Sequence, residues 1–206
     1  MYTRLPAFVI GFHGCDQSVG ERIIAGKMPM RRSENDYDWL GHGFYFWEGN
    51  YTRALEWAKR QAKTPRKGGP TIRRPFDLGA VIDLGHCLNL LEQAPLTLVK
   101  QSHQALAAEL ARVGLPVPTN RPIGTSQDLI LRHLDCAVIE FLHQNNKANH
   151  GTPYDSVRAM FVEGEPLYAG AGFHAKSHIQ ICVRDERCIK GFFRPRIDPV
   201  NVESAS

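Results

Sequence analysis

Residues 41–48, Gly-His-Gly-Phe-Tyr-Phe-Trp-Glu, limit the fold of this chain more than any other stretch. Four consecutive aromatic side chains have high strand propensity, and the two glycines allow another group to approach the backbone closely. Side chains alternate along a strand, so Phe44 and Phe46 face one side while Tyr45 and Trp47 face the other. We therefore expect one face in the core and one able to present a phenol and an indole to a pocket. The alternative is a buried strand whose Tyr45 hydroxyl finds a local partner.

Length and composition predict a single globular domain over residues 1–206, of which 43% are hydrophobic, because such a chain suffices for one core and not comfortably for two. The five cysteines include no Cys-x-x-Cys pair, which argues against a disulfide framework or zinc ribbon and for a reducing, cytoplasmic location. The nine histidines show no metal-ligand spacing, so no metal site is expected. With no run of about 18 apolar residues, neither a membrane span nor a Sec-type signal is expected.

Further apolar runs predict the other strands of the domain. The first, residues 7–12, has the pattern of a strand buried on both faces that ends at His13 and Gly14. A titratable side chain at such a strand end is commonly a satisfied structural residue. The remaining predicted strands are residues 79–84, 87–90, 157–162, 179–183 and 188–193.

Capping signals predict two helices in the first third of the chain. Asp16 or Ser18 can cap a short helix that stops at Gly26. Thr52 can cap a second helix that runs to about Lys63 and carries Trp57.

Residues 95–146 predict a helical insertion made of two long helices. Pro95 opens the first, which continues to Val113. Thr125-x-x-Asp128 fits a capping box for the second, which stops at the asparagine pair 145–146.

Two irregular segments are candidates for contact with other molecules. Residues 64–75 are rich in proline and carry Arg66, Lys67, Arg73 and Arg74, which favours either a solvated loop or a contact with a nucleic-acid backbone. The formal net charge of +4 adds a mild attraction for polyanions. Residues 163–178 have the length and composition of a functional excursion between two strands.

Three separated motifs together resemble the ADP-ribosyltransferases of the diphtheria-toxin and poly(ADP-ribose)-polymerase type. His13-Gly14 is similar to that family's strand ending in His-Gly, and residues 41–46 look like its Gly-x-Gly-aliphatic-Tyr-Phe strand. The helix that follows carries an aromatic residue, here Trp57. Residues 180–185 stand where the family has the strand that begins with its catalytic glutamate, and Gln180 takes that position. Their order, each at a predicted strand, is more specific than any one motif.

The resemblance implies an α+β fold with a split antiparallel sheet core, flanking helices and NAD bound in the cleft between the half-sheets. It further implies that His13 hydrogen-bonds a ribose of NAD, that the backbone of Gly14 holds the nicotinamide carboxamide, and that Tyr45 stacks on the nicotinamide ring. Trp57 would close the other side of that ring. The variable loop 163–178 would help to select the acceptor.

Gln180 departs from the family pattern because an amide forms hydrogen bonds but carries no charge. Polymer elongation is therefore not expected, whereas transfer of a single ADP-ribose unit remains possible. Glu48, Glu163 and Glu165 each lie near a predicted site element and are candidates for a substitute carboxylate.

The leading hypothesis is a cytoplasmic enzyme that moves one ADP-ribose from NAD onto a macromolecule and releases nicotinamide, as a toxin or a phage-defence effector would. Its catalytic residues would be His13, Tyr45 and Gln180. The acceptor is protein, RNA or DNA, and the basic charge tilts the expectation slightly toward nucleic acid. The alternatives are a catalytically silent module that binds NAD or ADP-ribose, an NAD glycohydrolase, and an α+β domain in which the His and Tyr are structural.

Overall fold

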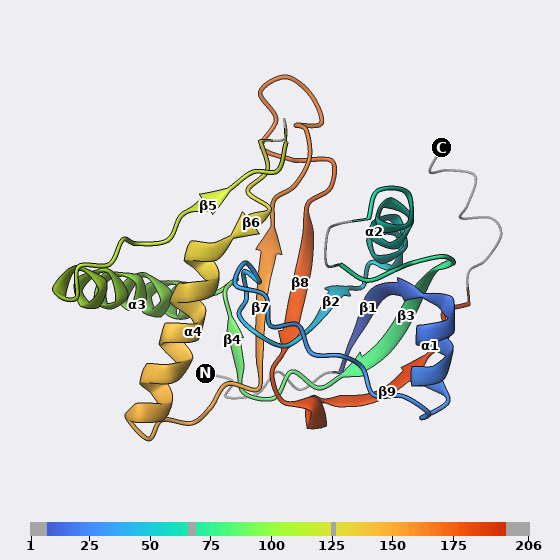
Figure 1. Cartoon of the computed structure of the whole chain (residues 1–206), viewed down its shortest axis with the longest axis horizontal. Coiled ribbons are helices and arrows are strands. Elements are labelled where there is room, and N and C mark those ends of the chain that lie inside the picture. Colours follow the sequence, from blue (N-terminus) through green and yellow to red (C-terminus); the bar gives the residue numbers. More distant parts are fainter. Residues whose placement is uncertain (1–7, 66–68, 125–126, 197–206) are drawn as a thin grey trace.

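The computed structural model describes residues 8–65, 69–124 and 127–196. Within them, the chain has an α+β fold in which helices flank a mixed seven-stranded sheet (Figure 1). The strands of this sheet are β1 (Val9–Asp16), β2 (Phe44–Glu48), β3 (Pro75–Ile82), β4 (Cys87–Asn89), β7 (Ser156–Phe161), β8 (His178–Val183) and β9 (Ile189–Phe193). Their order is β4-β7-β8-β2-β1-β3-β9, with β4 and β7 parallel and the other neighbours antiparallel.

Four α-helices and a small hairpin complete the described part of the fold. The helices are α1 (Gln17–Ile24), α2 (Tyr51–Lys63), α3 (Gln93–Arg112) and α4 (His133–Ala148); β5 (Asn120–Arg121) pairs with β6 (Leu131–Arg132), and a short 3-10 turn spans Glu186–Cys188. None of these described helices is both long and apolar enough to cross a membrane.

The two N-terminal helices are capped by residues that end the preceding segment. The Asp16 carboxylate accepts the Ser18 N–H at 3.0 Å and begins α1, so of the two predicted caps Asp16 is confirmed. Asn50 caps α2 by accepting the Arg53 N–H at 3.1 Å, and the prediction that Thr52 is the cap is wrong. Asn50 follows Gly49, whose positive φ of 60° turns the chain out of β2 directly into the helix.

Strand β1 is longer than its apolar pattern predicts. It continues past His13 to Asp16, because its antiparallel ladder with β3 runs without interruption from the Val9–Ile82 pair to the Asp16–Pro75 pair. The prediction that the strand ends at His13 is therefore wrong. His13 lies inside the strand, where it pairs with Leu78 of β3.

The region predicted as a helical insertion contains α3, the β5–β6 hairpin and α4, between β4 and β7. Thr125 lies outside the described residues, and the prediction that the helix starts at Asp128 is wrong, because α4 begins only at His133. The Asp128 carboxylate instead accepts the Gly164 N–H at 3.1 Å. Helix α4 begins at His133, where the Asn120 side chain accepts the Leu134 N–H at 3.0 Å. The cap of this helix thus comes from the hairpin rather than from the residues before the helix.

Helices α2 and α4 cover the same face of the sheet at two different places. Ala54 of α2 packs with Trp47, whereas Ile139 of α4 lies in the cluster that contains Cys182 and contacts Tyr45. Because Tyr45 and Trp47 are two residues apart on β2, both clusters are on one face. Helix α4 thus covers the β4–β7–β8 part of the sheet, whereas α2 covers the part that contains β1 and β2. Helix α3 packs against α4 (Figure 1).

The opposite face is covered by α1. Ile23 packs there with Phe44 and Phe46, which are 6% and 0% exposed. The prediction that these two phenylalanines face the core is confirmed.

The expected pair of half-sheets is a single hydrogen-bonded sheet in the structure. Its shortest ladder within the central strands joins β1 to β2, which pair only at Gly11–Glu48 and Phe12–Trp47. Beyond these two pairs the strands separate, because His13 occupies the position of the next ladder contact, as described below. The sheet is therefore not divided into two halves, and its only described irregularity between β1 and β2 is this short ladder, a partly open seam within one sheet.

Candidate functional site

The three residues predicted to be catalytic lie on adjacent strands. His13 is on β1, Tyr45 on β2 and Gln180 on β8, and these strands are neighbours in the order β8-β2-β1. Gln180 pairs directly with Trp47, so its side chain lies on the face that Tyr45 and Trp47 share. His13 alternates to the opposite face, with its ring centroid 6.1 Å from that of Phe46. The structure therefore brings the three residues together around one seam but does not place their side chains on one face.

The peptide groups of Gly14 point into this seam. Along an antiparallel strand, successive residues direct their N–H and C=O groups alternately to the two neighbouring strands. The Gln17 N–H bonds Arg74 O on the β3 side, whereas Ile10 O accepts the Gly49 N–H on the β2 side. Gly14 is an even number of residues from Ile10, so its peptide groups also point toward β2. The β1–β2 ladder has ended before this position.

His13 replaces a backbone hydrogen bond across the seam. Its Nδ1 lies 2.9 Å from Tyr45 O, the carbonyl that the Gly14 N–H would reach in a regular ladder. Because the carbonyl can only accept, Nδ1 carries the proton and Nε2 presents a lone pair. Burial lowers the pKa of His13, against the effect of the Tyr45 bond, which favours this neutral form. Within the described residues, Nε2 has no hydrogen-bond partner.

Trp57 lies directly over Gly14. A Cβ atom at position 14 would come within 2.3 Å of Ala54 O and 3.0 Å of the Trp57 ring, so only glycine allows α2 to pack this closely. The structure thus brings together the predicted pair of a carboxamide-binding backbone and an aromatic ring.

Tyr45 has a local partner for its hydroxyl, which is the alternative foreseen for this strand. The hydroxyl accepts the Leu40 N–H at 3.0 Å and donates to Gly41 O at 2.7 Å. Its ring packs on the cluster of Leu40 and Cys182, and burial raises the pKa of Tyr45 well above its usual value. Stacking of Tyr45 on a nicotinamide ring stays a prediction.

Tyr45→Phe is expected to lower the free energy of unfolding by about 1–3 kcal/mol, because the Leu40 N–H loses its partner in a half-buried place. Urea denaturation monitored by circular dichroism measures this change. Tyr168→Phe is the matched control, since Tyr168 is 62% exposed. An equal effect of the two substitutions would contradict the structural role of the Tyr45 hydroxyl.

Gln180 is held by a residue that the sequence did not single out. The indole Nε1 of Trp39 donates to Gln180 Oε1 at 2.6 Å. The Trp39 ring meets Phe161 edge-on at a centroid distance of 5.1 Å, and the Arg132 guanidinium lies 4.5 Å above it. Trp39 comes from the polar segment before β2, where the sequence pattern indicated only a loop.

Of the three candidate carboxylates, Glu163 lies among charged groups near Gln180. It is 7% exposed, accepts from Arg53 Nη2 at 2.8 Å and lies 3.8 Å from Nδ1 of His178, which is two residues before Gln180 on β8. Glu48 is instead bound by Arg158 through contacts of 2.5 and 2.8 Å. Glu165 is exposed in the excursion between β7 and β8.

Polar atoms without a partner gather near Glu163. Trp47 Nε1, Arg53 Nε and His178 Nε2 are buried, and none of them has a hydrogen-bond partner among the described residues. His178 is neutral in character, because burial lowers its pKa, and its Nδ1 bonds Lys176 O at 2.7 Å. Buried polar groups are normally satisfied, so three unpaired atoms close to one another are an unusual feature of the contact between α2 and the sheet.

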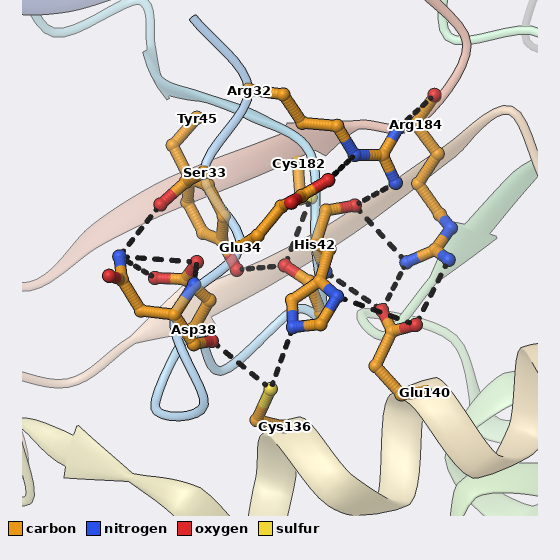
Figure 2. Close-up of polar contacts among 12 residues, drawn as sticks. Arg32, Ser33, Glu34, Asp38, His42, Tyr45, Cys136, Glu140, Cys182 and Arg184 are labelled. Carbon is orange, nitrogen blue, oxygen red and sulfur yellow. Dashed lines mark hydrogen bonds and ion pairs between the residues drawn. The ribbon is translucent and has the colours of Figure 1, made fainter.

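The loop that carries Trp39 is anchored by a second group of charges, shown in Figure 2. Arg184 donates to the Glu140 carboxylate of α4 at 2.6 and 3.3 Å, and the His42 N–H donates to the same carboxylate at 2.8 Å. Gly41, with φ of 78°, lies close to the Glu140 carboxylate, because a Cβ atom at position 41 would be 2.4 Å from Glu140 Oε1. Sequence reasoning missed this group, because its members come from three distant segments.

A groove of about 550 Å³ opens beside this anchor and contains none of the three predicted catalytic residues. It is lined by Asp36, His42, Val117, Pro118, Thr119, Arg121, His133, Cys136, Ala137 and Glu140. Cys136 Sγ lies 4.0 Å from His42 Nε2, but burial raises the pKa of the thiol to about 12, which disfavours a reactive thiolate. In the described part of the chain, no group of three His, Cys, Asp or Glu side chains could hold a metal ion.

The cationic segment is described only in part. Arg66 and Lys67 lie outside the described residues, whereas Arg73 and Arg74 have exposed side chains and backbone N–H groups bound by the Asp16 carboxylate at 2.8 and 3.0 Å. The segment is thus attached to the start of α1, and contact with nucleic acid stays a prediction.

The chain was compared with family models, curated proteins and solved structures, and none of the three comparisons found a match.

Proposed function

We propose that this chain is an NAD-dependent mono-ADP-ribosyltransferase that transfers one ADP-ribose unit to a macromolecule and releases nicotinamide. The single observation that carries the proposal is the substitution of His13 Nδ1 for the Gly14 N–H as the partner of Tyr45 O. This substitution directs the peptide groups of Gly14 and the Nε2 lone pair of His13 toward ligands rather than toward a neighbouring strand. A regular sheet would satisfy these groups internally.

The chemistry of the reaction matches what these groups offer. The bond between the nicotinamide nitrogen and ribose C1′ breaks, its electron pair leaves with nicotinamide, and positive charge develops on the ribose. The Gly14 N–H can donate to the carboxamide oxygen, and the Trp57 ring above Gly14 can stack on the pyridinium. The acceptor then attacks C1′ with a lone pair and loses a proton to solvent or to a nearby base.

The ribose is the part of NAD that His13 would contact. Nε2 can accept a hydrogen bond from a ribose hydroxyl, which orients the sugar while the bond breaks. The partly open β1–β2 seam is also the feature closest to the split sheet that the resemblance implies. Strand β8, which carries Gln180, pairs with β2 on the side away from this seam.

The acceptor class is inferred from the charge of the chain. The net charge of +4 and the exposed Arg73 and Arg74 favour nucleic acid. Protein remains the second acceptor class.

The test is incubation of the purified chain with NAD labelled in its adenosine half, together with a cell lysate. Nicotinamide is quantified by chromatography, and the labelled macromolecule is digested with nuclease or protease to identify its class. Equimolar nicotinamide release and macromolecular label are expected. Free ADP-ribose as the sole product identifies a glycohydrolase, and tight NAD binding in calorimetry without turnover identifies a binding module. Either outcome overturns transferase activity.

Gln180→Glu is expected to raise the rate of nicotinamide release by about tenfold, because a carboxylate stabilises the positive charge that develops on the ribose. The Trp39 indole N–H can hold a carboxylate oxygen as it holds the amide oxygen, so the new side chain keeps its place. Initial rates at saturating NAD measure the effect. Glu165→Gln, in the exposed loop, controls for a change of charge alone, and a slower Gln180→Glu enzyme contradicts the prediction.

A further inference from the structure

We propose that Trp39 is a positioning residue that fixes the Gln180 amide with its NH₂ group turned toward the substrate. This inference rests on the proposed function and specifies how Gln180 takes part in it. Trp39 Nε1 lies 2.6 Å from Gln180 Oε1. An indole nitrogen can only donate, so the atom that faces it must be the amide oxygen, and the NH₂ group must point elsewhere.

The indole is itself held in one place. Its ring is packed edge-on against Phe161 and is covered by the guanidinium of Arg132, which also lies 5.4 Å from the Phe161 ring. Arg132 forms an ion pair with Asp135 of α4. A cation over an indole face and an aromatic edge contact each stabilise one ring orientation.

The loop on both sides of Trp39 is also fixed. Before it, the Asp38 carboxylate accepts the Asn35 N–H at 2.8 Å. After it, the Leu40 N–H bonds the Tyr45 hydroxyl. The His42 N–H bonds Glu140 (Figure 2). Contacts from the strand that carries Tyr45 and from α4 therefore hold Trp39 in place. Through its hydrogen bond, Trp39 in turn fixes the orientation of the Gln180 side chain.

Fixing the amide decides which hydrogen bonds the site offers. A free glutamine side chain can turn its oxygen or its nitrogen toward a ligand, because the two ends have the same shape. With the oxygen turned toward Trp39, the NH₂ group is the end of the Gln180 amide that faces away from the indole, and it can donate, for example to a ribose oxygen. The site thus offers a donor where a glutamate would offer an acceptor and a charge. Loss of the indole N–H removes this selection while most of the ring packing is retained by phenylalanine.

The hydrogen bond itself is tested by NMR of the Trp39 indole proton in ¹⁵N-labelled protein. In the wild type this proton is expected downfield and protected from solvent exchange, and in Gln180→Ala it moves upfield and exchanges faster. Rapid exchange in the wild type, or no response to Gln180→Ala, overturns the inference whatever the activity of the protein.

The positioning role is tested by a double-mutant cycle on nicotinamide release. Trp39→Phe is expected to lower kcat by about tenfold with the KM for NAD changed less than about twofold, because the ring is retained and only the orientation of the amide is lost. In a Gln180→Ala background the same substitution is expected to change kcat by less than about twofold, since no amide remains to orient. Thermal denaturation of each variant accompanies the cycle.

Equal losses of kcat in both backgrounds show that Trp39 acts through packing and overturn the positioning role, while the proposed function stands. A wild-type protein that releases no nicotinamide overturns the proposed function, and the role of Trp39 in catalysis falls with it. The two failures are thus distinguished by the wild-type rate alone.

Discussion

Arg184→Met is expected to lower the free energy of unfolding by about 3 kcal/mol, because it leaves the Glu140 carboxylate mostly buried with a single backbone partner. The side chains of Arg184 and Glu140 are only 15% and 19% exposed, and two contacts join them, at 2.6 and 3.3 Å. Arg184 also donates to His42 O at 3.2 Å, so the substitution loosens the loop before β2 as well. Chemical denaturation with urea measures the change.

A matched ion pair on the surface provides the control for Arg184→Met. Arg112 and Glu109 of α3 form a contact of 2.8 Å, but their side chains are 71% and 56% exposed. Arg112→Met is therefore expected to change the unfolding free energy by less than about 1 kcal/mol. The double variant Arg184→Met/Glu140→Met should recover part of the loss, because no unpaired charge remains in it. A single variant as stable as the wild type would contradict the assignment.

The pH dependence of the same variant follows from Glu140. Burial raises the pKa of this carboxyl, but hydrogen bonds from Arg184 and the His42 N–H outweigh burial and hold the pKa below the ordinary value of 4.5. A lowered pKa gives stability that is present above pH 4.5 and is lost as the pH falls through the folded pKa. Once the Arg184 bonds are lost, burial raises the Glu140 pKa of the variant above that of the wild type. The difference in stability between wild type and Arg184→Met is therefore expected to be largest near neutral pH and to shrink as the pH falls from the raised pKa of the variant to the lowered pKa of the wild type.

The strands of the candidate site were predictable from local pattern, whereas the contacts around them were not. Aromatic and apolar runs predicted β2 and β8, and the alternation along β2 correctly separated Phe46 from Trp47. Strand pairing is decided by neighbours that are distant in sequence, which is why the end of β1 was misplaced. Nothing in the apolar pattern of residues 7–16 indicates that pairing with β3 would continue past His13.

Trp39 and Glu140 show what a single sequence cannot reveal. Trp39 is a lone aromatic residue in a polar segment, and its partner Gln180 is 141 positions away. Glu140 lies on the predicted second long helix, yet nothing in its helical spacing indicates a bond to Arg184, 44 positions later. Such long-range polar contacts depend on the tertiary fold, whereas helix and strand periodicity depends on local geometry.

His13→Ala is expected to lower the rate of nicotinamide release by about a hundredfold, the largest effect on activity that the site predicts. The substitution removes the Nε2 lone pair that would orient the ribose. It also frees Tyr45 O, which can then pair with the Gly14 N–H and close the seam as a regular ladder. Both changes weaken contacts with the substrate. Because the new bond between the Gly14 N–H and Tyr45 O replaces the one lost from His13, the unfolding free energy should fall by no more than about 1 kcal/mol.

His86→Ala is the matched control, because His86 Nδ1 also bonds a backbone carbonyl, Pro153 O, at 2.8 Å. It removes the same type of contact at a place that contains none of the proposed site residues, so activity should be unchanged. Calorimetry with NAD separates binding from turnover, and His13→Ala should weaken binding because the closed seam no longer offers the Gly14 peptide groups. Full activity of His13→Ala would mean that the imidazole only joins two strands. The β1–β2 seam would then be a structural irregularity, and the α+β domain with a structural histidine would be the better account of the chain.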